Sequence, residues 1–127
     1  MMKAFYRMAA IAILTLSSLA RAEGDAAQGQ MLFQSRCIAC HSIDAHRVGP
    51  ALGGVFGRRA GSAPGYQYSP AVKDSGVVWN AQTLERWLTN PEALIPGQRM
   101  GYSVADPMIR ADLIAYMRAA SQSAQTP

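Results

Sequence analysis

The stretch Cys37-Ile38-Ala39-Cys40-His41 decides the fold expected of this 127-residue chain. Two thiols separated by two residues and followed directly by a histidine form the pattern of covalent c-type haem attachment. Cysteines at i and i+3 on one helical turn can reach the two vinyl groups of a haem, and His41 then points its imidazole at the iron. The pattern therefore predicts one haem c, with Cys37 and Cys40 as thioether anchors and His41 as an iron ligand.

Two other kinds of site fit these cysteines less well. A structural zinc ion needs four ligands, and the chain has no third cysteine. A thiol-disulfide oxidoreductase would also use a C-x-x-C pair, but without the histidine that follows it here.

The first 22 residues have the three-part pattern of a secretory signal peptide. Lys3 and Arg7 give a positive start, residues 8–19 are mostly apolar, and Ala20-Arg21-Ala22 is a small-x-small cleavage site. The apolar run is shorter than the ~20 residues of a membrane-spanning helix, so an uncleaved anchor is the weaker alternative. We expect residues 23–127 to form one periplasmic monohaem domain without stable membrane insertion.

The net charge of +4 belongs mainly to this leader. Three of the twelve basic residues, Lys3, Arg7 and Arg21, precede the cleavage site, which leaves nine basic residues against eight acidic ones. Two ionised haem propionates would bring the remaining +1 to about −1. The basic composition is therefore no indication of nucleic-acid or membrane binding, and no nucleic-acid partner is expected.

Local patterns predict three main helices and no strand. Asp25 is an N-cap for a helix to residue 36, and Asn80 caps a helix over residues 81–90 that ends at Pro91. Asp106 followed by Pro107 begins the last helix. Between these helices lie two long loops, residues 48–73 and 91–105, which a large apolar cofactor would organise. The expected class is all-α, with loops wrapped around the haem.

The second iron ligand must come from another part of the chain. His46 lies only five residues beyond His41, and we interpret it as a solvated loop residue. Met100 follows Pro96-Gly97 in a loop and is predicted to be the ligand, since a His/Met pair is expected of an electron-transfer haem protein. The other methionines after residue 22 fall in predicted helices and are interpreted as core residues: Met31, Met108 and Met117.

Taken in order, these segments resemble the class I cytochromes c, closest to the mitochondrial and bacterial c2-like branch. The resemblance runs from Gly24 to Ala120 and rests on the following residues: Gly29, Phe33, Cys37–His41, Gly49-Pro50, Gly53-x-x-Phe56-Gly57-Arg58, Pro64-Gly65-Tyr66-x-Tyr68, Trp79, Asn90-Pro91, Ile95-Pro96-Gly97-x-x-Met100 and Arg110–Tyr116.

The resemblance implies the cytochrome c fold, a monomer, and a haem crevice with one exposed edge. It implies that the Pro50 carbonyl accepts the second imidazole N–H of His41. It also implies that Arg58, Tyr68 and Trp79 hydrogen-bond the inner haem propionate, whose burial requires donors. Two packing contacts follow as well: Gly29 and Phe33 are expected against Leu113 and Tyr116.

Three departures from the family pattern concern the haem surroundings. Val72 stands where relatives place an asparagine, and Trp87 where a tyrosine usually lies beside the methionine ligand. Glu92 and Ala93 replace lysines of the haem edge, although Arg99 keeps one positive charge. Strong electrostatic steering toward an acidic partner is therefore not expected.

The function implied is reversible one-electron transfer between redox proteins through transient complexes, not enzymatic catalysis. A dedicated subunit of a periplasmic dehydrogenase or oxidase is an alternative that the sequence does not separate from a general carrier. A haem peroxidase or gas sensor is a further alternative, which would require an open iron position in place of Met100.

Overall fold

Five helices and the long segments between them make up the computed structural model, which describes residues 23–125. The predicted signal peptide, residues 1–22, lies outside the described residues. The helices are α1 (Ala26–Arg36), α2 (Pro70–Lys73), α3 (Ala81–Thr89), α4 (Pro91–Leu94) and α5 (Pro107–Ser123). Within residues 23–125 there is no strand beyond one isolated bridge between Arg59 and Val78. The predicted all-α class is confirmed.

The three main helices begin where their capping residues predict. The Asp25 carboxylate accepts hydrogen bonds from the backbone N–H groups of Ala27 and Gln28. Asn80 and Thr83 form a reciprocal capping box at the start of α3. Asp106 accepts from the Met108 N–H, and Pro107 occupies the first turn of α5. Each side chain satisfies backbone donors that have no partner inside the helix.

Two single-turn helices, α2 and α4, were not predicted from the sequence. Ser69 accepts from the Val72 N–H in front of Pro70, and Asn90 accepts from the Ala93 N–H in front of Pro91. Proline suits the first position of a helix because its missing N–H would have no helical partner there. Pro91 therefore starts α4 as well as ending α3.

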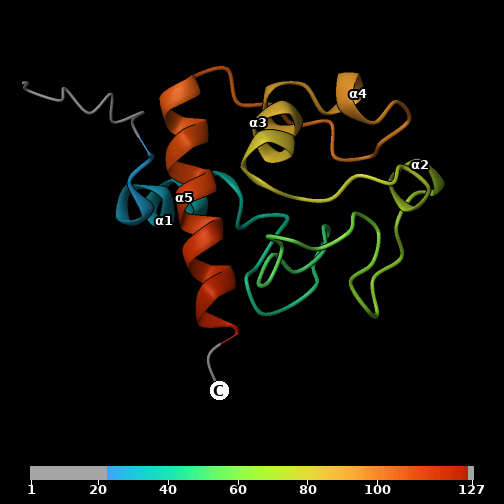
Figure 1. Cartoon of the computed structure of the whole chain (residues 1–127), viewed down its shortest axis with the longest axis horizontal. Coiled ribbons are helices and arrows are strands. Elements are labelled where there is room, and N and C mark those ends of the chain that lie inside the picture. The colour runs from blue at the N-terminus through green and yellow to red at the C-terminus, as the bar shows by residue number, and fades with distance from the viewer. Residues whose placement is uncertain (1–22, 126–127) are drawn as a thin grey trace, which may run out of the picture.

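The crossing of α1 and α5 joins the two ends of the described chain (Figure 1). Gly29 is buried at the crossing, where a Cβ atom would meet the Asp112 carbonyl and lie 2.9 Å from the Tyr116 Cβ. The rings of Phe33 and Tyr116 pack with centroids 5.3 Å apart. The predicted contact between the first and last helices is confirmed, and it requires glycine because the backbones approach so closely.

The C-terminal part of α5 contains a buried polar residue. Ser121 lies inside this helix with 1% of its surface exposed. Its Oγ accepts a hydrogen bond from the Phe56 N–H at 3.2 Å. The hydroxyl satisfies a loop amide, which is why a polar residue can be buried at this position.

The helical methionines do not all belong to the core. Met117 is buried on α5, as predicted, but Met31 and Met108 are 58% and 73% exposed. The core interpretation is wrong for these two, because each lies on the solvent side of its helix. An isolated exposed apolar residue is ordinary on a protein surface.

The long loops are held by backbone hydrogen bonds to the segment that precedes α3. The N–H groups of Gly57 and Ala60 donate to the carbonyls of Trp79 and Val77, both at 2.8 Å, and Trp79 donates back to Arg58 at 2.9 Å. These bonds place the loop after the cysteines beside α3. Among residues 23–125, no helix combines the length and apolar character needed to cross a bilayer.

Candidate functional site

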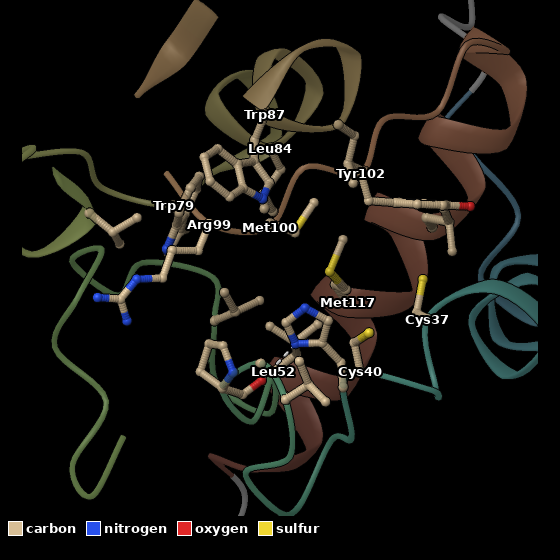
Figure 2. A pocket seen from close by; sticks show the side chains of 18 of the residues that line it. Cys37, Cys40, Leu52, Trp79, Leu84, Trp87, Arg99, Met100, Tyr102 and Met117 are labelled. Atoms are coloured by element: carbon tan, nitrogen blue, oxygen red, sulfur yellow. Dashed lines mark hydrogen bonds between the residues drawn. The ribbon is translucent and has the colours of Figure 1, made fainter. Parts of the chain in front are cut away.

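A cavity of about 390 Å³ collects every residue that the sequence predicted for the site. This volume lies within the range of small-molecule and cofactor pockets. Figure 2 shows the cavity from close by, with side chains from several elements directed into it. The predicted site residues that line it are Cys37, Cys40, His41, Pro50, Arg58, Tyr68, Trp79 and Met100.

The rest of the wall is mainly apolar and comes from α1, α3, α5 and the loops. These lining residues were not predicted to be site residues: Phe33, Leu52, Val55, Leu84, Leu88, Leu113 and Met117. Leu84 and Leu88 lie four residues apart on α3, and Leu113 was expected only as a packing contact between the first and last helices. Helical spacing shows that a side chain points inward, but it does not distinguish a residue packed in the core from one that lines a cavity.

The two cysteines lie on one turn that continues from α1. The N–H groups of Cys40 and His41 both donate to the Cys37 carbonyl, at 3.1 and 2.8 Å. Both cysteines are free thiols. Burial raises the pKa of Cys37 to about 11, so this thiol is protonated at neutral pH. A thiol-disulfide oxidoreductase depends on a thiolate with a depressed pKa, which makes that alternative a poor match.

His41 is held in one orientation by the loop that follows it. Its Nδ1 lies 2.8 Å from the carbonyl oxygen of Pro50. Because a carbonyl can only accept, Nδ1 carries the proton and Nε2 keeps a free lone pair for a metal. Burial lowers the pKa of His41, and the hydrogen bond to Pro50 opposes that shift. The ring is therefore neutral at physiological pH, as a metal ligand must be.

Met100 reaches the cavity from the segment between α4 and α5. Figure 2 places it near Trp87 and Leu84, across the cavity from Cys40 and Leu52. Trp87 packs edge-on against Trp79 with ring centroids 5.3 Å apart. The thioether of Met100 therefore lies on a different side of the cavity from the turn that carries Cys37 and Cys40.

Arg58, Tyr68 and Trp79 contribute hydrogen-bond donors to the lining of the cavity. Arg58 donates to the carbonyls of Ala51 and Gly53 at 3.0 and 3.4 Å, which uses part of its five-donor guanidinium. The Tyr68 hydroxyl oxygen accepts from the Ala63 N–H, so its own hydrogen can be donated elsewhere. Among residues 23–125, the indole N–H of Trp79 donates no hydrogen bond.

The ionisable lining residues are positive or neutral. Arg36, Arg58 and Arg99 line the cavity, and no carboxylate of residues 23–125 does so. An apolar cavity with arginines and unused donors is suited to a large apolar ligand that carries acidic groups.

His46 takes no part in this lining, in agreement with its exclusion as a ligand. It is exposed, but it is more than a solvated loop residue. Its two ring nitrogens lie 2.7 Å from the Pro64 carbonyl and 2.9 Å from the Ala51 nitrogen. No local pattern around His46 predicts these contacts, because the partners lie in other parts of the loops.

The fold and the cavity define a c-type haem protein: a cysteine turn, a neutral histidine with a free Nε2 and a thioether meet around one apolar space. The comparisons with known proteins agree. Residues 26–121 match the family model for cytochrome c. The chain belongs to the cytochrome c family.

Individual relatives cover most of the chain. Cytochrome c of Sesamum indicum is 42% identical over 102 residues, which are 77% of this chain and 92% of the relative. Cytochrome c2 of Rhodopila globiformis is 44% identical over 97 residues, 74% of this chain and 92% of the relative. The solved structure of cytochrome cH from Methylobacterium extorquens is 42% identical, with a TM-score of 0.72, covering 76% of this chain and 99% of that one.

These likenesses establish the fold, the cofactor and the general function that the sequence predicted. The chain has the cytochrome c fold, binds one covalent haem c, and is a monohaem electron carrier.

Proposed function

We propose that this chain carries single electrons between redox proteins with the haem iron held between His41 and Met100. The observation that carries the proposal is the convergence of both side chains on the apolar cavity that also contains Cys37 and Cys40. When bound, the haem supplies an iron that cycles between the ferric and ferrous states.

The protein ligands would determine how that iron behaves. His41 offers Nε2 because Pro50 holds the proton on Nδ1. Met100 offers a soft sulfur, which favours ferrous iron and raises the reduction potential. The apolar wall acts in the same direction, because it disfavours the extra positive charge of the ferric state. Cys37 and Cys40 would anchor the cofactor through thioether bonds.

Arg58, Tyr68 and Trp79 would bind the inner propionate of the haem. Arg58 keeps donors beyond those it gives to Ala51 and Gly53, and Tyr68 and Trp79 each keep one. A carboxylate removed from water requires such partners. All three side chains line the cavity, which supports this role.

A carrier fits this site better than an enzyme that works on an open iron. A peroxidase or gas sensor needs a coordination position for its substrate. If both His41 and Met100 bind the iron, substrate would have no access to the metal. We therefore propose that the chain is not an enzyme.

Replacing the methionine tests the ligand assignment. In the Met100→Ala holoprotein, we expect loss of the charge-transfer absorption of methionine-ligated ferric iron and ready binding of added imidazole. Met117→Leu is the matched control, because Met117 also lines the cavity and leucine keeps its apolar bulk. A wild-type protein that binds imidazole as tightly as the alanine variant would reject Met100 as a ligand.

We further propose that the chain works as a periplasmic monomer after cleavage behind Ala22. The leader pattern of residues 1–22 supports export, and covalent haem attachment is compatible with it. Its partners would be an electron donor and an acceptor that bind transiently. Mass measurement of the purified exported protein would show a chain that begins at Glu23 and carries one haem, whereas an intact leader would contradict cleavage.

A further inference from the structure

Arg110 on α5 is a buried charge that the electron-transfer site does not use directly. The residue is 9% exposed, and it does not line the cavity. Burying a guanidinium is unfavourable unless its donors are satisfied. The three contacts that satisfy it indicate what the residue holds in place.

The contacts join two helices to the segment that carries Met100. Arg110 Nε donates to the Glu85 carboxylate on α3 at 2.7 Å. One terminal nitrogen donates to the carbonyls of Val104 and Ala105 at 2.7 and 2.9 Å. Both carbonyls lie within five residues of Met100, on its C-terminal side.

The segment itself has little internal structure to fix Met100. Residues 95–106 form neither helix nor strand. On the N-terminal side, the Gln98 side chain accepts from the Gly101 N–H at 2.9 Å, which closes a turn around Met100. On the other side, the Val104 N–H donates to the Leu88 carbonyl at 2.7 Å. Val104 is 2% exposed and is therefore the buried anchor of this half of the segment.

Arg110 and Leu88 together hold Val104 through both of its backbone polar groups. Because Arg110 is also bonded to Glu85, the anchor is fixed relative to α3 and α5 at once. Those two helices supply the cavity residues Leu84, Leu88 and Leu113. The guanidinium thus connects the segment that carries Met100 to the two helices that line the cavity.

We propose that Arg110 is a positioning residue for Met100, which keeps the sulfur at the iron by anchoring Val104 and Ala105. The proposal rests on the proposed role of Met100 as a ligand. Lysine is not an equivalent replacement, since its single ammonium lacks the planar fork that reaches carboxylate and carbonyl acceptors together.

The test measures how readily an added ligand displaces Met100 from ferric holoprotein. The apparent affinity for imidazole is proportional to the fraction of molecules in which the methionine is off the iron. We expect Arg110→Gln to bind imidazole at least about tenfold more tightly than wild type, because charged hydrogen bonds to the anchor are lost. Its methionine-to-iron absorption band should also weaken at a lower temperature than in wild type.

Arg118→Gln is the matched control on the same helix. Arg118 is exposed and lies over the Phe56 ring at 5.1 Å, away from the methionine segment. Its imidazole affinity should equal that of wild type. Thermal unfolding of both variants separates general loss of stability from a local effect on the ligand.

Three outcomes decide the proposal. Reduced stability of Arg110→Gln with unchanged imidazole affinity would overturn it and leave a purely structural role. If the glutamine variant does not fold, Arg110→Lys is measured instead, and unchanged affinity there has the same meaning. If wild type binds imidazole as tightly as Met100→Ala, the assignment of Met100 as an iron ligand fails. This comparison involves no Arg110 variant, so the failure of the ligand assignment is distinguishable from the failure of the positioning role.

Discussion

The imidazole of His46 joins two loops by donating from Nε2 to the carbonyl oxygen of Pro64 at 2.7 Å, across 18 positions of sequence. Its Nδ1 accepts from the Ala51 N–H at 2.9 Å. Since Nδ1 is the acceptor, Nε2 is the nitrogen that donates to Pro64. The contact ties the turn that carries Pro50 to the loop that carries Tyr66 and Tyr68.

Replacing His46 by alanine should therefore weaken the loops, and His46 itself does not line the cavity. Two hydrogen bonds are lost, so we expect the free energy of unfolding to fall by about 1–2 kcal/mol. Denaturant titration of the holoprotein measures it. Gln67→Ala is a control at an exposed position in the same loop. An unchanged unfolding midpoint for the His46 variant would show that these two hydrogen bonds contribute nothing to stability.

A side chain at Gly49 should disturb the histidine ligand. A Cβ atom at this position would overlap the His41 ring. Overpacking of this kind costs about 1–3 kcal/mol, and here it would push the imidazole away from Pro50. We expect Gly49→Ala to give less haem-loaded protein and altered absorption of the ferric form.

The comparison for Gly49 is Gly76, where a Cβ would meet nothing within 4 Å. Gly76 has a φ of +70°, so alanine there introduces backbone strain alone. Gly76→Ala should lower stability but leave the absorption spectrum as in wild type. Equal spectra for both variants would argue against a steric requirement at residue 49.

Alanine at Gly29 should destabilise the crossing of α1 and α5. Alanine would gain about 0.5–1 kcal/mol in helix propensity. Overpacking against the rigid Asp112 carbonyl costs about 1–3 kcal/mol, so the net effect is a loss. Thermal unfolding should show a lower midpoint for Gly29→Ala than for wild type. Gln30→Ala, at the adjacent exposed position, should stay within about 0.5 kcal/mol of wild type, and a similar loss there would refute the packing explanation.

The neighbouring arginines 58 and 59 allow a matched test of electrostatics. Arg58 lines the cavity, whereas Arg59 is exposed and does not. A positive charge near the haem disfavours the ferric state, so Arg58→Gln should lower the reduction potential by tens of millivolts. Arg59→Gln should change it much less because solvent screens the charge. Equal shifts of the reduction potential in equilibrium redox titrations of both variants would indicate a general effect of net charge. They would argue against a specific effect of the Arg58 position.

Local chemistry accounts for what could be predicted about the helices. Asp25, Asn80 and Asp106 each satisfy amides only two or three residues away, so their positions in the sequence were sufficient to find the helix starts. The single turns α2 and α4 were missed because a four-residue helix has no periodic pattern to detect. The same reasoning failed for Met31 and Met108, since helix membership does not tell which side faces solvent.

The functional site also combines features that local sequence determines with features that depend on tertiary contacts. The sequence by itself determined the cysteine turn and its histidine, because Cys37, Cys40 and His41 act within one turn of chain. The loop position of Met100 and the expected His/Met ligand pair made it a candidate, and resemblance to a known family supplied Pro50 and Arg58. Only the tertiary structure brought them to one cavity and showed that Pro50 orients His41 and that Arg110 anchors the Met100 segment. These relationships join residues far apart in sequence, and packing of α3 and α5 with the loops, not any local pattern, decides which of them meet.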